Sequence, residues 1–141
     1  MKPHRVNDFR WTWNGDIVIG ETGDIKDTRE HDLLSFVQEI KTRVRSDLYD
    51  WQLHPHLGAA LSDLIGRPNS KELAEQGKAR IISALIRNGL VARKFIKISY
   101  VPVDRHHLMY RLAIVIPDMI EGEQIELNLL LDTDEFEILF V

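Results

Sequence analysis

Residues 107–116 have the sequence HLMYRLAIVI, and this stretch decides the fold class. Apolar side chains occupy every second position from Leu108 to Ile116, which is the period of a β-strand with one buried face. The same alternation recurs in segments 95–103, 124–131 and 136–140. Short polar turns join strands of this kind into antiparallel pairs. We therefore expect residues 93–141 to form an antiparallel sheet of about four strands.

Helices are predicted before this sheet. The first is expected to begin near Asp27, which can cap it with Glu30 in the capping-box position. Its apolar stripe is Leu33, Val37, Ile40, Val44 and Leu48, widened by Phe36. The opposite side carries Glu39, Arg43 and Arg45, which predicts a solvated face.

Two more helices are expected within residues 27–89. A short one is predicted over 57–65, with Gly66 in a left-handed conformation after its end. The next is predicted to begin at an Asn69 cap and to end at Asn88-Gly89. Gly77 lies within its apolar stripe, where a glycine permits close packing.

The N-terminal segment is predicted to be a hairpin or an arm. Phe9, Trp11 and Trp13 alternate, and Asn14-Gly15 suits a tight primed turn. With helices first and hairpin-linked strands after them, the order indicates an α+β fold. We expect one domain over 1–141, in which 1–26 is the arm, 27–89 the helical part and 93–141 the sheet.

Composition limits the possible functions. The 141 residues include no cysteine, which excludes disulfides, thiol nucleophiles and cysteine-ligated metals. No stretch is long and apolar enough for a membrane span, and the first residues lack the apolar run of a secretory signal. The formal net charge of -4 argues against nucleic acid as the main partner. We expect a soluble protein of a reducing compartment that binds neither nucleic acid nor membrane.

Charge is unevenly distributed along the chain. Between Lys78 and Arg111 there are eight basic residues and one acid, whereas 117–141 contains eight acids and no Lys or Arg. The two groups could neutralise each other within one sheet. Alternatively, the acidic C-terminal strands could face a basic partner, and such complementarity mainly steers association.

No catalytic motif stands out. His54 and His56 could share a strand face and bind a metal, but a loop pair is the better interpretation. The adjacent His106 and His107 are expected in a solvated turn. Acids that could serve a glycosidase are Glu30, Asp32, Asp47 and Asp50, and nothing in the sequence marks any of them as a catalytic pair. We therefore predict no enzyme activity, no catalytic residue, no cofactor and no metal.

The C-terminal strand instead suggests an interface. An uncovered strand presents unpaired backbone N–H and C=O groups, which invite another chain to add a strand. Leu130 and Leu139 interrupt the polar faces of their strands, which suggests a second contact surface. The alternative is that this chain covers both features itself.

The order of features resembles the baseplate wedge family of contractile injection machines, also labelled the phage tail lysozyme-like family. Gly23-Asp24-Ile25 precedes the first helix, and Pro55-x-x-Gly58-x-x-Leu61-x-x-Leu64 is similar to the family's proline–glycine–leucine pattern. The family's acid–proline–arginine triplet corresponds to Val91-Ala92-Arg93, which keeps only the arginine. Ser46-Asp47 replaces the family's Gly-Glu element. The resemblance covers about residues 16–131.

This resemblance implies a structural role in contractile-tailed phages, type VI secretion baseplates or related particles. Family members contact the wedge core bundle and offer C-terminal strands to the first ring of sheath protein, as sheath initiators present in six copies. The protein would then lie in the virion tail baseplate, assembled in the host cytoplasm. The residues expected to bind partners are Phe136, Ile138, Phe140, Val141, Leu130, Leu139, Arg93, Trp11 and Trp13. Alternatives are a peptidoglycan-degrading, lysozyme-like hydrolase of the tail and a cytosolic adaptor unrelated to tails.

Overall fold

The structure is a computed structural model, and the residues it describes are 10, 17–24, 32–50, 52–64, 66–115, 124–132 and 137–140. The α-helices are α1 (Asp32–Arg45) and α2 (Lys71–Ile86). The strands are β1 (Ile96–Pro102), β2 (His107–Val115), β3 (Gln124–Asp132) and β4 (Glu137–Phe140). The predicted α+β class is confirmed, although the number of elements differs from the prediction.

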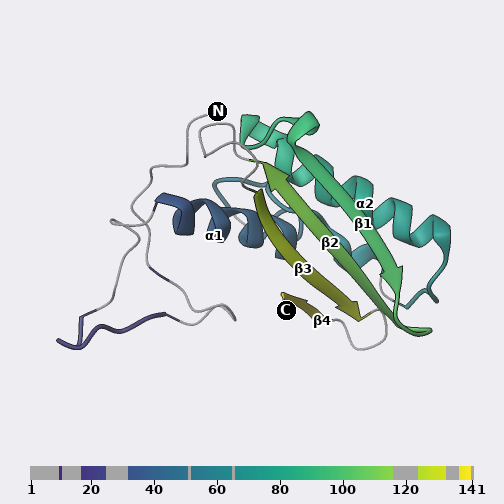
Figure 1. The fold of residues 1–141 in the computed structure, drawn as a ribbon, viewed down its shortest axis with the longest axis horizontal. Helices are drawn as coiled ribbons and strands as arrows, with labels where there is room; N and C mark the ends of the chain where they lie inside the picture. The colour runs from purple at the N-terminus through teal and green to yellow at the C-terminus, as the bar shows by residue number, and fades with distance from the viewer. Residues whose placement is uncertain are drawn as a thin grey trace.

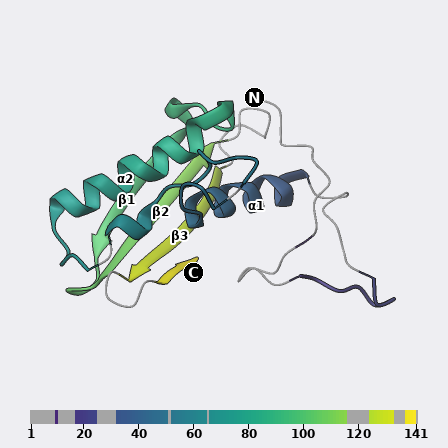
Figure 2. The ribbon, with the colours of Figure 1, turned by 180° about the vertical axis from the view of Figure 1, so that it is seen from behind.

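The strands form an antiparallel sheet in the order β1-β2-β3-β4. Three of them are long, whereas β4 has only four residues. Both α1 and α2 lie on one side of the sheet, so neither described α-helix covers the other face (Figures 1 and 2). The alternation in β2 is confirmed, because Leu108, Tyr110, Leu112 and Ile114 are at most 1% exposed. These side chains form the centre of the core between the sheet and the helices.

Gly77 fits α2 against the sheet, as its place in the apolar stripe predicts. A Cβ atom at this position would overlap the hydroxyl group of Tyr110. That hydroxyl donates a hydrogen bond of 2.8 Å to the carbonyl oxygen of Ala74 in α2. The close approach of helix and strand therefore requires a glycine here.

The helix predicted over 57–65 is wrong. Only a single 3-10 turn forms, over Leu61–Leu64. Gly58 has φ +136° and Ala60 has φ +54°, values that a right-handed helix does not allow. The apolar spacing still places Leu61 and Leu64 in the core, and Gly66 has the predicted left-handed conformation with φ +80°.

The predicted cap of α2 is displaced by one residue. Ser70, not Asn69, is the N-cap, and its hydroxyl oxygen accepts a 3.1 Å hydrogen bond from the backbone N–H of Leu73. The helix ends where predicted, since Asn88 and Gly89 have φ of 57° and 70°.

The solvated face predicted for the first helix is also wrong at Arg43. This side chain is 8% exposed and forms a 2.8 Å ion pair with Glu39. Its Nη1 donates to the carbonyl oxygens of Ala84 at 3.2 Å and Arg87 at 2.6 Å. The last carbonyls of a helix lack intrahelical donors, and the guanidinium supplies them at the end of α2. The charge pattern of the first helix alone cannot show that carbonyl groups at the end of α2 require a donor.

Several predictions fall outside the described residues. The cap at Asp27 and Glu30 does so, as do Trp11, Trp13 and most of the N-terminal hairpin. One described hydrogen bond joins the two arms of that predicted hairpin, from the Val18 N–H to the Arg10 carbonyl at 3.0 Å.

Candidate interaction site

The edge of the sheet at β4 is the candidate site. β4 pairs with β3 from Leu129↔Phe140 to Asp132↔Glu137, which is four residue pairs. The rest of β3, residues 124–128, has no strand partner on that side within the described ranges. Backbone donors and acceptors along such an edge can pair with an added strand.

The core holds β4 through its alternating side chains. Phe140 is 5% exposed, and Ile138 packs against the core while remaining partly exposed. Their backbone partners Leu129 and Leu131 are fully buried. The Lys41 ammonium of α1 lies 5.7 Å from the centroid of the Phe140 ring, an arrangement typical of a cation–π contact. The inner face of the edge strand is therefore fixed by its own chain.

Leu130 begins a small apolar row on the face without helices. This half-buried residue is the backbone partner of both Met109 in β2 and Leu139 in β4. Met109 in turn pairs with Val101 in β1, which is 63% exposed. The predicted second contact surface thus corresponds to a cross-strand apolar row that reaches the β4 edge. Phe136 and Val141 lie outside the described residues.

Arg93 lies at the opposite edge of the sheet, beside the start of β1. Its Nη1 donates a 3.2 Å hydrogen bond to the carbonyl oxygen of Ile96. β1 and β4 are the two outer strands of the described sheet, so Arg93 and the C-terminal strand lie at opposite edges.

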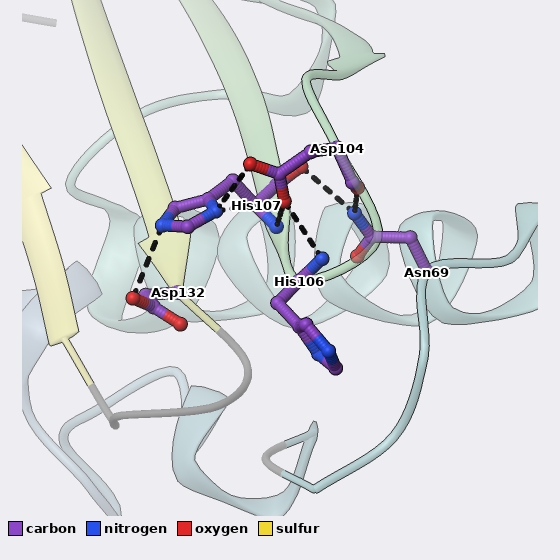
Figure 3. Close-up of polar contacts among 5 residues, drawn as sticks. All are labelled: Asn69, Asp104, His106, His107 and Asp132. Atoms are coloured by element: carbon purple, nitrogen blue, oxygen red, sulfur yellow. Dashed lines mark hydrogen bonds and ion pairs between the residues drawn. The ribbon is translucent and has the colours of Figure 1, made fainter.

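A polar cluster links two hairpins near the start of β4 (Figure 3). His107, the first residue of β2, lies between two carboxylates. Its Nδ1 is 2.7 Å from both carboxylate oxygens of Asp104, in the β1–β2 turn, and its Nε2 is 3.1 Å from Oδ2 of Asp132, the last residue of β3. The cluster therefore connects the β1–β2 turn to the residue at which β3 ends.

Backbone and amide groups hold this cluster in place. The N–H groups of His106 and His107 donate to Oδ1 of Asp104 at 2.8 and 2.9 Å. The Asn69 amide, just before α2, donates to the carbonyl oxygens of Asp104 at 2.5 Å and His107 at 2.8 Å. The turn is thus fixed both internally and by the segment that leads into α2.

The cluster raises the pKa of His107 and lowers the pKa of Asp104. The hydrogen bond with Asp104 raises the pKa of His107 above its ordinary value, and the charges of both carboxylates act in the same direction. The backbone N–H of His106, followed by the His107 side chain, lowers the pKa of Asp104. Both shifts favour a charged imidazolium between charged carboxylates.

His107 is partly solvent-exposed, as predicted for the histidine pair, but it is the first residue of β2 and not part of the turn. Its side chain is 36% exposed and bonded on both ring nitrogens, whereas the His106 side chain points away from it (Figure 3). A signal was present in the sequence. The antiparallel register that aligns the apolar faces of β2 and β3 pairs His107 with Asp132.

The charge segregation is partly explained within the sheet. Arg111 of β2 and Glu126 of β3 form a cross-strand ion pair of 3.2 Å, and His107 pairs with Asp132. The Arg111–Glu126 pair is exposed on both sides, and such pairs contribute little stability. Basic and acidic residues therefore neutralise each other at two points within the sheet.

Among the described residues, no group of three His, Asp or Glu side chains is arranged to hold a metal ion, and no helix has the length and apolar character of a membrane span. The Asp50 carboxylate accepts the backbone N–H of Asp47 at 2.8 Å and thereby closes a turn.

Comparison of the chain with known protein families, with curated proteins and with solved structures gives no match.

Proposed function

We propose that this protein is a structural subunit of a contractile tail baseplate that initiates sheath assembly by offering its C-terminal β-strand to a sheath subunit. The observation that carries the proposal is the position of β4. Within the described part of the chain, it is an outer strand and pairs with the second half of β3 but not with residues 124–128. An incoming strand could therefore pair with β4, or continue its line along residues 124–128. Strand addition of this kind uses backbone hydrogen bonds for affinity and alternate side chains for specificity.

The two edges of the sheet differ in how well they suit strand addition. β1 carries Lys97 and ends at Pro102, and lysine and proline are residues by which edge strands avoid pairing. β4 contains neither and has the sequence EILF. The contrast gives the sheet one receptive edge, so association would have a direction.

The resemblance to the baseplate wedge family gives this edge a partner. In the proposed arrangement, Arg93 and the β1 side face the wedge core bundle, while β4 faces the first sheath ring. The separation of Arg93 from β4 supports two contact surfaces at opposite edges. Six copies, one for each wedge, would present six such strands in one ring.

The decisive experiment removes the strand. A variant lacking residues 135–141 is mixed with purified baseplates and sheath protein, and sheath length is scored by electron microscopy. We expect no sheath nucleation from the truncated protein, with its fold verified by circular dichroism. Lys97→Ala, at the other edge, is the matched control and is expected to nucleate normally. Normal nucleation by the folded truncated protein would refute the proposal.

A further inference from the structure

The Asp104–His107–Asp132 cluster lies at the root of the proposed strand-offering edge. Asp132 is the last residue of β3, and its backbone partner Glu137 is the first residue of β4. A bond to the Asp132 side chain therefore acts where the chain leaves β3 for β4. The other end of this bond belongs to the β1–β2 hairpin, which the Asn69 amide ties to the start of α2.

The contacts of the His107 ring indicate its protonation state. A carboxylate accepts hydrogen bonds, and each nitrogen of His107 faces one, at 2.7 Å on Nδ1 and 3.1 Å on Nε2. A neutral imidazole has one N–H donor, so one of its nitrogens would present a lone pair to a carboxylate. Only the imidazolium can donate to Asp104 and Asp132 together.

We propose that His107, as a doubly donating imidazolium, clamps the root of the β3–β4 hairpin and so positions β4 for strand addition. The clamp deepens the proposed function and rests on it for its biological role. Asp104 contributes the fixed end, because two backbone N–H groups already hold its carboxylate. Asp132 contributes the releasable end, because its bond to the ring is the longer one. His107 is thus a positioning residue that acts on β4 through Asp132.

Loss of the proton would open the clamp at Asp132. The neutral ring keeps its Nδ1–H on Asp104, and the Nε2 lone pair then repels the Asp132 carboxylate. The charged groups around the ring are Asp104 from the turn and Asp132 from β3. Arg105 lies in the same turn. The net acidic surroundings favour the protonated, closed form.

The sign of the pH dependence follows from these shifts. The pKa of His107 is raised in the fold, so its contribution is complete below the ordinary histidine value of about 6.5 and is lost as the pH rises through the raised value. The pKa of Asp104 is lowered, so its contribution is present above the ordinary aspartate value of about 3.9 and is lost as the pH falls through the lowered value. The clamp is therefore closed in mildly acidic solution and opens as the pH rises through the raised pKa of His107.

The test uses the full-length protein without partners. Nuclear magnetic resonance follows the His107 ring through its titration, and hydrogen exchange measures the protection of the β4 amides on either side of the midpoint. Protection factors, corrected for the intrinsic exchange rate, remove the direct effect of pH. We expect β4 protection to fall severalfold as His107 loses its proton, while amides of α2 change little.

Two variants separate the clamp from general stability. Asp132→Asn replaces the releasable carboxylate with an amide that can accept from or donate to Nε2, so β4 protection should lose its dependence on His107. His106→Gln, the matched control, changes the neighbouring ring that points away and should retain that dependence (Figure 3). A pH-independent β4 in the native protein, or an unchanged pH profile in Asp132→Asn, would overturn the proposal.

The clamp and the proposed function can fail separately. If residues 135–141 are needed for sheath nucleation but the protection of the β4 amides does not depend on the protonation of His107, the clamp is rejected and the proposed function stands. If the truncated protein nucleates sheath normally, the function is rejected, whatever the exchange data show.

Discussion

Replacement of Gly77 by alanine tests how α2 is held against the sheet. An added Cβ would overlap the Tyr110 hydroxyl and lie 3.3 Å from Cδ1 of Leu64. Tyr110 is fully buried and bonded to the Ala74 carbonyl, so its ring cannot move aside without losing that bond. Overpacking a core costs about 1–3 kcal/mol, and loss of a buried hydrogen bond costs about 1–3 kcal/mol. Alanine recovers about 1 kcal/mol of helix propensity relative to glycine.

The net expectation for Gly77→Ala is a loss of about 1–5 kcal/mol in the free energy of unfolding. Urea denaturation followed by circular dichroism measures it. Tyr110→Phe removes the hydroxyl oxygen, the nearer of the two Tyr110 atoms that the new methyl group would overlap, so the double variant should be more stable than the sum of the single effects predicts. Ala79→Gly, at an exposed site of α2, calibrates the propensity term. A Gly77→Ala protein as stable as the native one, or additive effects in the double variant, would refute the reasoning.

Substitutions of Arg43 and Gly58 test packing that the sequence did not reveal, and Gly66 supplies a comparison for Gly58. Arg43→Met keeps the aliphatic stem but removes the donors to the Ala84 and Arg87 carbonyls. Urea titration should show a free energy of unfolding that is lower by about 1–3 kcal/mol. An unchanged midpoint would show that water replaces the guanidinium. Gly58→Ala places a Cβ 2.6 Å from the Ser46 carbonyl oxygen at φ +136°, whereas Gly66→Ala at φ +80° meets no atom within 4 Å. Gly66→Ala should therefore lower the free energy of unfolding by about 1–2 kcal/mol, from backbone strain alone. Gly58→Ala should lower it clearly more. Equal melting temperatures for the two variants would contradict the packing described for Gly58.

The strands could be predicted from the sequence because their pattern is set by local geometry. Side chains alternate across a strand whatever its neighbours are, so an apolar alternation marks both the strand and its buried face. The pattern at 107–116 located β2 to within one residue. The same alternation places Phe140 and Ile138 on one face, and this face packs against the core, although both residues were expected to bind partners.

The failures share a different cause, which is dependence on distant groups. The apolar spacing at 57–65 is compatible with a helix, but Gly58 is drawn against the backbone of Ser46 and Asp47, and the helix cannot form there. Arg43 is buried because carbonyl groups some forty positions later in the chain need a donor. Neither requirement is visible in a local window of sequence.

In the candidate site, too, the features set by local geometry could be predicted, and those set by distant residues could not. The position of β4 at an edge follows from strand order, which short turns dictate. The cluster around His107 depends on Asp132, which is remote in the sequence and adjacent only once the register of β2 and β3 is known. Sequence reasoning therefore found the edge and missed the group that holds its root.

A four-residue edge strand needs support if it is to be offered in a defined register. So short a strand, paired on one side only among the described residues, gains little from its own hydrogen bonds. Burial of Phe140 and partial burial of Ile138 fix its inner face, and the bond between His107 and Asp132 fixes the residue at which β3 ends. With the cost of ordering β4 met inside the subunit, a partner strand would have to order only itself, which is the advantage of preorganisation. The same reasoning explains why the positioning group should lie at the hairpin root: a bond on the outer edge of β4 would occupy the backbone groups that a partner needs.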